Sequence, residues 1–595
     1  MRGRSGSTAP LEEAPPSSAT AAPGRHASTS RPPQAERALR WAAVGVPALV
    51  LMWAGWARRW TTDDGFINFR IVHMLVEGNG PVFNVGERVE TYTSPLWLGT
   101  LALGDLLLPL RLEYVSLALS IPLAGLGIVA MGSGARRLWQ GPTDRWWLPC
   151  GTIVVLAVAA MWDFTTSGLE FGVTLAWLGG LTWVLGRWVT EDRRLTVGEA
   201  VLVGLGPLVR PDTTVYTLAV LVLVVVLRWR AESWRDRGVV LAAALALPVL
   251  YELFRMAYFA SLVPNTALAK GADVSHWGPG WTYLRNLVGT YQLLIPLALL
   301  LVVAVLLARD SDARRRWVLA VLPATALVQT LGIVHAGGDY IHARLLLPAV
   351  VAFVAPLAVI PVRRVLLVPV AALGVWGLVA ATSLRMEGSV TAGRSLIANG
   401  HDVATGSTKI ANPVTKEQNG YGSLERYDRI DTGIWNDTIK VDVEPKPGIR
   451  HPLSAMSGVG VGGFQIGDRV HVLDRLGLGD ALTARLEVDR PGFIGHEKVL
   501  PDAWLAARVT DDDVPPGSFG KGVFGSELYV SPPGRDDADA DAARRALRCS
   551  SLTRLQHAIS DPLTFGRAMR NIGESFGLTR LKVPPDPNEA LRELC

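Results

Sequence analysis

The sequence is poor in cysteine and in charge. Three of its 595 residues are cysteine, Cys150, Cys549 and Cys595, and their spacing excludes a zinc-type cluster. Charged residues make up 19% of the chain and hydrophobic residues 49%, which is too apolar for a soluble protein and too charged for a pure membrane bundle. The net charge of +5 comes with arginines between apolar runs, so it does not indicate a nucleic-acid partner.

The N-terminus has no clear secretory signal. Residues 1–40 are rich in Ala, Pro, Ser, Thr and Arg and have almost no large apolar side chains, which predicts a disordered cytoplasmic tail. The first apolar segment begins near Trp41 without a small-residue cleavage site, so we interpret it as an uncleaved first span. Residues 41–381 are then mostly apolar runs, whereas residues 382–595 have the composition of a soluble domain.

Long apolar runs predict a polytopic α-helical membrane protein. A helix needs about 20 apolar residues to cross the hydrocarbon core. The twelve candidate runs are 41–57, 95–110, 115–134, 148–162, 171–186, 197–209, 213–227, 239–259, 290–308, 317–335, 345–361 and 365–381.

Basic connections between these runs predict the topology. If all twelve runs crossed, the loop with Arg136 and Arg137 would lie outside, against the rule that basic loops face the cytoplasm. Placing residues 95–110 as a helix at the outer interface removes the conflict and leaves about eleven crossings. The C-terminal domain then lies outside the cytoplasm, where Cys549 and Cys595 could pair.

This topology gathers ionisable side chains at the outer face. An ionisable group costs about 2.5–3.5 kcal/mol at a helix centre on insertion scales, so such a gathering suggests a site. A carboxylate can take a proton from an acceptor hydroxyl, while cations can hold a phosphate leaving group. The mixture suits transfer of a sugar from a lipid phosphate to a hydroxyl. The residues are Asp63, Asp64, Asp163, Glu170, Arg210, Asp212, Lys270, His335, Asp339, His342 and Arg344.

Structural roles stand beside this interpretation. The acidic pair in "RRWTTDDGFINFR", Asp63 and Asp64, could cap a helix, and Glu170 could be an acid favoured by a helix dipole. Arg210-Pro211-Asp212 could be a helix break with an internal ion pair, and Lys270 could snorkel from the end of a span. The histidines could be hydrogen-bonded interface residues.

Several motifs resemble one known family. The run "DDGFINFRIVHMLVEGNGPVFNVGERVETYTSPLW" from Asp63, with "TSGLE", "RPD", "VPNT", "GGD", "LDRLGLGDALTARL" and "RPGFIGHEK", resembles the actinobacterial terminal β-(1→2) arabinofuranosyltransferases. An acidic pair after the first span is also typical of the polyprenyl-phosphate-dependent glycosyltransferases of the GT-C fold. The resemblance covers roughly residues 40 to 510.

The resemblance implies a donor, an acceptor and a location. The donor would be decaprenylphosphoryl arabinose, and the acceptor the non-reducing ends of cell-wall arabinan, the polymer of arabinogalactan and lipoarabinomannan. The enzyme would be a multi-pass protein of the cytoplasmic membrane, with its active site and C-terminal domain facing the periplasm. A β-linked donor and a β-linked product imply net retention, for which the sequence shows no nucleophile.

The resemblance and the charges together assign candidate roles. Asp63 or Asp64 takes the position of the acid that activates the acceptor, and Lys270, Arg210 and Arg344 are candidates for the donor phosphate. Some related enzymes bind a divalent cation near the acidic pair, but no ligand spacing shows one here. The other candidate site residues are Glu170, Asp212, Asn265, Asp339 and His342.

The C-terminal part predicts a mixed, β-containing domain. "TIKVDVE", "GVGVGGFQIG" and "RVHVLD" alternate as strands do, and "DADADAARRALRCSSLTRLQHAI" is helical in pattern. Trp435 and Asn436 suit a sugar face, although a tryptophan more often lies in a core. Carbohydrate binding is therefore one candidate role for this domain.

Two other classes of function compete with a glycosyltransferase. A transporter or flippase of a lipid-linked sugar also gathers charges near a membrane cavity, but transporters often repeat their spans and no convincing repeat is found here. A membrane-anchored polysaccharide-binding protein needs only one or two anchors and leaves most apolar runs unexplained.

The basic loops generate a topology prediction. A cysteine introduced at Gln140 should react with an impermeant thiol reagent only after the cytoplasmic side is opened, because residues 95–110 do not cross. Labelling of this position from outside intact cells would contradict the assignment.

Overall fold

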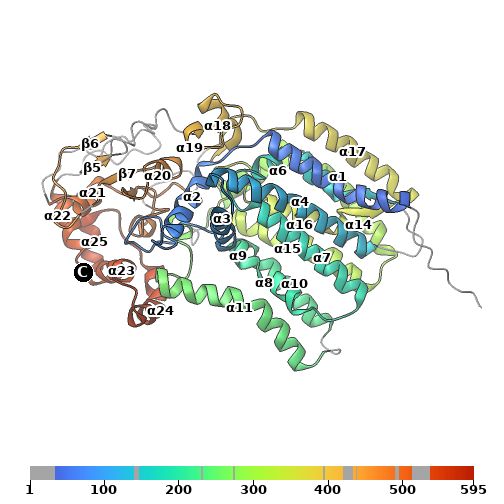
Figure 1. Cartoon of the computed structure of the whole chain (residues 1–595), viewed down its shortest axis with the longest axis horizontal. Helices are drawn as coiled ribbons and strands as arrows, with labels where there is room; N and C mark the ends of the chain where they lie inside the picture. Colours follow the sequence, from blue (N-terminus) through green and yellow to red (C-terminus); the bar gives the residue numbers. More distant parts are fainter. Residues whose placement is uncertain are drawn as a thin grey trace, which may run out of the picture.

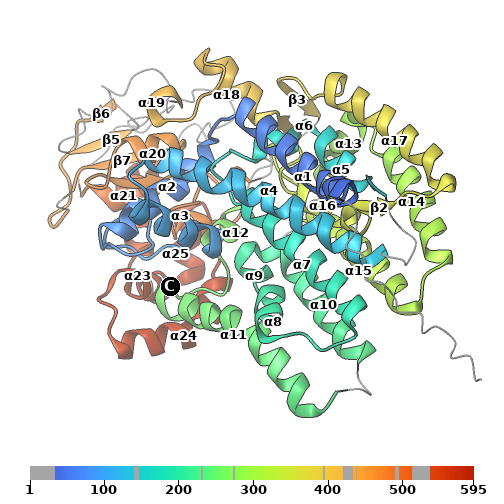
Figure 2. The same cartoon turned by 45° about the vertical axis from the view of Figure 1, so that its right-hand side comes forward.

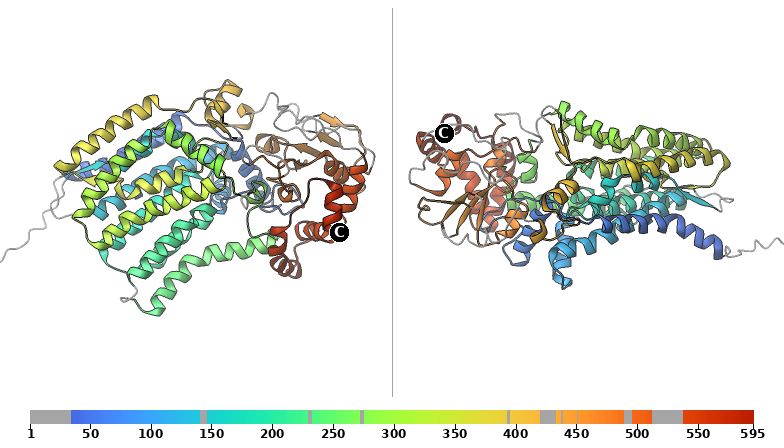
Figure 3. Two further views of the ribbon diagram at one scale, coloured as in Figure 1. Left: turned by 180° about the vertical axis from the view of Figure 1, so that it is seen from behind. Right: turned by 90° about the horizontal axis from the view of Figure 1, so that it is seen from above.

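The computed structural model describes residues 34–139, 146–228, 232–271, 275–392, 395–419, 433–436, 439–449, 451–488, 495–511 and 537–595. Residues 1–33 of the tail expected to be disordered and the loop around Gln140 lie outside these residues, whereas residues 34–40 are helical and begin α1 (Gln34–Ala57), against the expectation. Figure 1 shows an elongated helical body, residues 34–383, beside a C-terminal region, residues 384–595, with α2 (Asp63–Val76) at their junction. Seen from above in Figure 3, the two parts lie end to end.

Each of the twelve apolar runs contains helix. The continuous helices are α1 (Gln34–Ala57), α3 (Pro95–Leu107), α4 (Leu112–Trp139), α7 (Phe171–Glu191), α10 (Thr214–Leu227), α11 (Trp234–Phe259), α13 (Trp277–Thr290), α14 (Leu294–Arg309), α15 (Ala313–His335) and α17 (Arg364–Ser383). Other runs are divided into α5 (Gly151–Ala157) and α6 (Ala159–Phe164), α8 (Val197–Gly204), α9 (Gly206–Val209) and η1 (Pro211–Thr213), and α16 (Leu347–Val354) and η2 (Ala355–Leu357). Strands β1 (Trp147–Pro149) and β2 (Val359–Pro361) pair antiparallel.

The helical body is that of a membrane protein. Among the described residues, α4, α11, α15 and α17 are long and apolar enough to cross a bilayer, and α13 with α14 would add one span bent by 78°. Four shorter apolar helices are Trp41–Ala57, Pro95–Leu107, Pro211–Leu227 and Leu347–Leu357. The helix-rich body is confirmed, whereas the expected number of about eleven crossings stays a prediction.

Small residues let two central helices meet backbone to backbone. On α4, Ser120, Gly127 and Gly134 recur every seven residues and face Gly172, Gly179 and Gly186 on α7. A side chain at any of the three α7 glycines would overlap the α4 backbone. Close approach at small residues is a common way for membrane helices to associate, because lipid supplies no hydrophobic driving force between them. Figure 2 shows α4 and α7 side by side.

The C-terminal region contains two of the three predicted strands and the predicted helical segment. A four-stranded sheet has the order β6 (Ile439–Val441), β5 (Ile434–Asn436), β7 (Leu453–Met456) and β8 (His471–Asp474). β5 and β6 are antiparallel, whereas β7 is parallel to both β5 and β8. A hairpin is formed by β3 (Ser389–Ala392) and β4 (Ser395–Ala398). The helices are α18 (Gly400–Thr408), α19 (Lys416–Asn419), α20 (Val461–Gln465), η4 (Thr483–Arg485), α21 (Asp502–Val509), α22 (Asp537–Ala546), α23 (Ser550–Ser560), α24 (Phe565–Arg580) and α25 (Pro587–Leu594).

One predicted strand is wrong. The segment "GVGVGGFQIG" forms α20 instead, and α20 packs on α2. Its glycines allow this approach, because a side chain at Gly460 would overlap the backbone of Asp63 and one at Gly463 would come within 3.0 Å of Phe83. The alternating pattern therefore reflects close packing against the helical body and not a sheet.

The two cysteines of the C-terminal region are joined. Cys549 and Cys595 form a disulfide with their Cα atoms 5.0 Å apart, while Cys150 is a buried free thiol. The bond links the start of α23 to the end of α25, so the last helix is tied to the core of this region. Trp435 is buried in a core, as the ordinary interpretation of a tryptophan predicts.

Candidate active site

The acidic pair lies at the first turn of α2 but does not cap it. Thr62 occupies the N-cap position and its side chain makes no capping bond. The hydrogen bonds found for the two carboxylates lead away from α2, toward Val461 for Asp63 and toward Arg344 for Asp64. The capping interpretation therefore leaves these contacts unexplained.

Asp63 is held by the C-terminal region. Its Oδ1 accepts a hydrogen bond of 2.8 Å from the backbone N–H of Val461 at the start of α20. Burial is the largest influence on this carboxyl group and raises its pKa to about 6; the charge of Asp64 acts in the same direction, against the backbone hydrogen bonds. At neutral pH Asp63 is thus an ionised carboxylate whose pKa is close to the ambient pH, as general-base catalysis requires.

Asp64 is held by the helical body. Burial alone would raise its pKa, but the charges of Arg344 and Lys270 keep that pKa below its usual range. The Arg344 guanidinium donates to Asp64, and its Nη1 also lies 3.5 Å from Asp339. The two adjacent acids thus differ, because the pKa of Asp64 is lowered and that of Asp63 is raised to about 6.

The backbone before Arg344 is unusual. Ala343 has φ 65°, in the left-handed region that a residue with a side chain occupies at a cost, and it is fully buried. The chain between α15 and α16 turns sharply at this point, which directs Arg344 toward α2.

Of the three cationic side chains predicted to bind the donor phosphate, two have N–H groups that make no hydrogen bond to the described residues. Among the described residues, Lys270 at the end of α12 (Asn265–Ala269) has neither an ion-pair nor a hydrogen-bond partner, although its charge acts on Asp64. Its methylene groups lie 3.6 Å from the position of a Cβ at Gly495. Buried Nε of Arg344 is likewise without a hydrogen-bond partner in the part of the chain that the structure describes. Both groups can donate to a phosphate.

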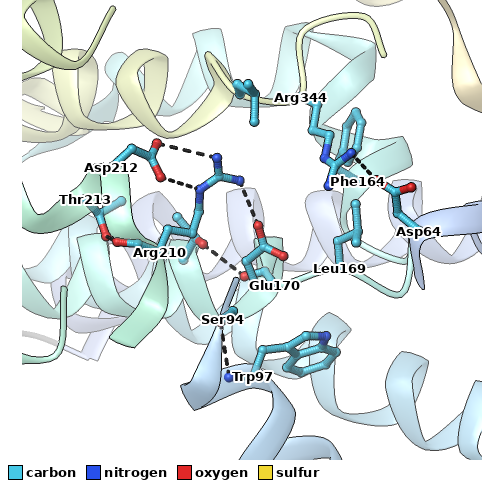
Figure 4. A network of polar contacts seen from close by, with 12 residues as sticks. Asp64, Ser94, Trp97, Phe164, Leu169, Glu170, Arg210, Asp212, Thr213 and Arg344 are labelled. Carbon is cyan, nitrogen blue, oxygen red and sulfur yellow. Dashed lines mark hydrogen bonds and ion pairs between the residues drawn. The ribbon is translucent and has the colours of Figure 1, made fainter. Parts of the chain in front are cut away.

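Arg210 has a different environment. Its Nη1 donates to Glu170 at 2.7 Å and its Nε to Asp212 at 2.8 Å, as Figure 4 shows. Asp212 also accepts from Gln329, which in turn accepts from Tyr216. Glu170, Arg210 and Asp212 thus form a network that ties α7, η1 and α15 together, beside the pair of Arg344 and Asp64. This network suits positioning better than phosphate binding.

Asn265 joins the helical body to the C-terminal region. Its side-chain amide donates to the carbonyl oxygens of Gly477, Leu478 and Asp480 at 2.8, 3.0 and 3.2 Å. The amide is buried and its donors are used, so Asn265 holds α12 and thereby places Lys270.

His342 lines a neighbouring cavity. The cavity has a volume of about 170 Å³, and Arg58, Asp163 and His401 are also in its lining. His342 Nδ1 lies 2.5 Å from Asn286 Oδ1, and burial lowers the pKa of this histidine to about 4, so it is neutral at physiological pH. Asp163 is ion-paired with Arg58. Neither Asp63 nor Asp64 is in the lining, so the structure separates these groups from the acidic pair.

A divalent cation does not fit the described side chains. No group of three His, Cys, Asp or Glu residues among them is arranged to hold a metal ion. Asp63 accepts a backbone hydrogen bond and Asp64 is paired with Arg344. We therefore derive no step through a metal ion.

Sequence reasoning missed the part of the site that comes from the C-terminal region. Gly460 and Val461 contact Asp63 although nearly four hundred residues separate them in the chain. The glycine-rich run was visible, but its alternation was assigned to a strand.

Comparison with known proteins shows what the chain is similar to. The AftB family C-terminal domain matches residues 451–593. A terminal β-(1→2)-arabinofuranosyltransferase of Mycobacterium tuberculosis is 31% identical, over 93% of this chain and 96% of the relative. One of Corynebacterium glutamicum, with the same name, is 29% identical over 91% and 86%. No solved structure matches. The similarity extends to the C-terminal end, which corrects the expectation that it stops near residue 510.

The contact between Asp63 and α20 generates a prediction. Gly460→Ala places a methyl group against the Asp63 backbone, so it should displace the carboxylate and lower turnover by on the order of 100-fold, as small misplacements of catalytic groups do. Gly406→Ala is the matched control, because a Cβ there meets open space. Transfer rates should be measured with membrane-inserted protein at equal amounts. Equal rates for the two variants would show that Asp63 does not depend on this contact.

Proposed function

The chain belongs to the family of terminal β-(1→2)-arabinofuranosyltransferases, and we propose that it transfers arabinofuranose from decaprenylphosphoryl arabinose to the non-reducing ends of cell-wall arabinan. It is therefore a glycosyltransferase. The observation that carries the proposal is the division of the acidic pair, with Asp63 on the C-terminal region and Asp64 on Arg344. Transfer needs a base for the acceptor and cations for the phosphate, and both meet at α2.

We further propose a GT-C arrangement with about eleven spans and the site at the outer face of the cytoplasmic membrane. The disulfide between Cys549 and Cys595 supports an oxidising compartment for the C-terminal region. Leu103, Leu106 and Leu107 of α3 are exposed, which supports contact of this short helix with lipid at the interface. Residues 382–595 then form the periplasmic domain and position the glycan near α2.

In the proposed reaction, the bond from the anomeric carbon to the phosphate oxygen breaks, and the acceptor hydroxyl oxygen bonds to that carbon on the face that the phosphate leaves, because a β-linked donor and a β-linked product imply net retention. Asp63 takes the hydroxyl proton, and decaprenyl phosphate leaves with the bonding electron pair. Lys270 and Arg344 bind the phosphate and stabilise the charge that develops on it. Asp64 holds Arg344 in place, and the network of Arg210 supports the wall of the site.

A transfer assay tests the function and the role of Asp63 together. Purified full-length protein in lipid nanodiscs is given labelled decaprenylphosphoryl arabinose and an arabinan acceptor. Asp63→Asn should lower transfer by roughly two orders of magnitude, because an amide cannot take the proton although its oxygen can still accept from Val461. Donor movement across the bilayer without transfer would favour a flippase, and glycan binding alone would favour a binding protein.

The raised pKa of Asp63 gives the assay a pH signature. Below about pH 6 the carboxylate takes up a proton and the base is lost, so wild-type turnover should fall as the pH is lowered through 6. The residual activity of Asp63→Asn should not show this fall in turnover at low pH. If Asp63→Asn and Asp64→Asn both keep nearly full activity, the acidic pair is not the catalytic centre.

The free ammonium group of Lys270 generates a separate prediction. Lys270→Ala should weaken donor binding by roughly tenfold or more and leave acceptor binding nearly unchanged, because the charge pairs with phosphate and not with a neutral glycan. The matched control is Lys440→Ala, at an exposed lysine of β6. KM values for donor and acceptor provide the measurement. An unchanged donor KM would show instead that Lys270 only snorkels from the end of a span to the membrane surface.

A further inference from the structure

Helix α24 has an apolar face without a partner in the described structure. Phe565, Met569 and Phe576 are 83%, 47% and 54% exposed, and half-buried Ile572 lies between them. Their spacing of four, three and four residues places all of them on one side of the helix. The buried side of the helix carries Asn571, Ser575 and Leu578. A soluble helix normally buries its large apolar side chains, so the exposed apolar face indicates an interaction surface.

The position of α24 indicates which surface it meets. Asn571 Nδ2 donates to the carbonyl of Ala257 in the last turn of α11, and the Thr579 hydroxyl accepts from the N–H of Leu262 just beyond it. Figures 1 and 3 show α24 beside this end of α11. The attachment is therefore at one end of a helix that is apolar enough to cross the bilayer.

The surface of α11 places the edge of the hydrocarbon at that end. In the most apolar 18-residue stretch of α11, 22% is buried inside the protein. Val249, Leu250 and Leu253 are exposed, so most of this helix faces lipid. The next turn carries Arg255, which pairs with Glu90 at 2.7 Å and with Glu252. Charged pairs begin where the hydrocarbon ends, and α24 attaches at this level.

The charge of α24 suits an anionic surface. Its sequence has three arginines and one glutamate. Arg567 is ion-paired with Asp561, whereas Arg570 and Arg580 are exposed. Arg580 follows Phe576 by four residues and so lies on the apolar side, while Arg570 points to another side of the helix. An amphipathic helix with phenylalanines on one side and an arginine beside them is typical of a helix that lies in the membrane interface.

We propose that α24 lies on the membrane surface, with Phe565, Met569, Ile572 and Phe576 inserted between lipid headgroups and Arg580 at the lipid phosphates. The occupant of this face is the bilayer that surrounds α11, because α24 is hydrogen-bonded to the end of α11, whose exposed apolar side chains face lipid. The contact gives the C-terminal region a second attachment to the membrane. It fixes the height of this region above the bilayer, and hence of Val461 beside Asp63.

Spin labels on the full-length protein in nanodiscs of anionic lipid test the proposal. A cysteine is introduced at Phe565, Met569 or Phe576, and Asp541→Cys on α22, which lies away from α11 in Figure 1, serves as the control. The three native cysteines do not take the label, because Cys150 is buried and the other two are joined. Exposed positions tolerate such labels with little effect on folding.

Collision rates with oxygen and with a water-soluble nickel chelate give the result. At the α24 positions oxygen collisions should exceed chelate collisions, and the ratio should reverse at position 541, because oxygen concentrates in lipid and the chelate stays in water. Chelate access at positions 565, 569 and 576 equal to that at 541 would overturn the proposal. Exclusion of both reagents, with spin–spin broadening that disappears on dilution with unlabelled protein, would overturn it in favour of a second copy of the chain. These outcomes do not depend on which sugar the enzyme transfers.

Discussion

The guanidinium group of Arg70 carries a positive charge from α2 into the C-terminal region, and the relation of the two parts depends on it. Carbonyl oxygens of Phe83, Gly463, Gly467 and Val470 accept its hydrogen bonds, and the side chain is buried. Among the described residues no carboxylate pairs with it within ion-pair distance. A buried charge of this kind is tolerable only while its donors are satisfied, so α2 cannot separate from these carbonyls without a large penalty. The same contact sets the position of the acidic pair two turns earlier on α2.

The candidate site is consequently composite. Asp63 takes its partner from the C-terminal region, Asp64 takes its partner from the loop between α15 and α16, and Lys270 is placed by Asn265, which again bonds the C-terminal region. Two adjacent residues with the same chemistry acquire different protonation behaviour because burial outweighs the backbone donors at Asp63, whereas nearby cations outweigh burial at Asp64. Such a division provides an acid–base group and a fixed charge from one dipeptide.

A second set of contacts holds the loop after α2. Arg88 donates to the carbonyls of Tyr258 on α11 and Ala558 on α23, and Glu90 pairs with Arg255. The loop therefore bridges the end of α11 and the C-terminal helices. Polar bonds of this kind are directional, unlike the packing of apolar helices in lipid, so they determine how the C-terminal region is oriented on the helical body.

The sequence alone determined the apolar runs, the change of character near residue 382 and the helical segment 537–559. These follow from local composition and periodicity, which each segment carries by itself. The family followed from the motifs that resemble it. It also selected Asp63, Asp64, Arg344 and Lys270, because ionisable groups beside membrane spans are few and costly. Only the tertiary structure decided that Gly460 and Val461 complete the surroundings of Asp63, that Arg210 is held by Glu170 and Asp212, and that Asn265 is a joint between the two parts. Contacts between residues that are hundreds of positions apart leave no periodic pattern in the sequence. A glycine-rich run has the same sequence pattern whether it forms a strand of a sheet or packs closely against a helix. The chemistry of the site was thus present in the sequence, whereas the division of roles between adjacent carboxylates arose from the surroundings that folding brought to each.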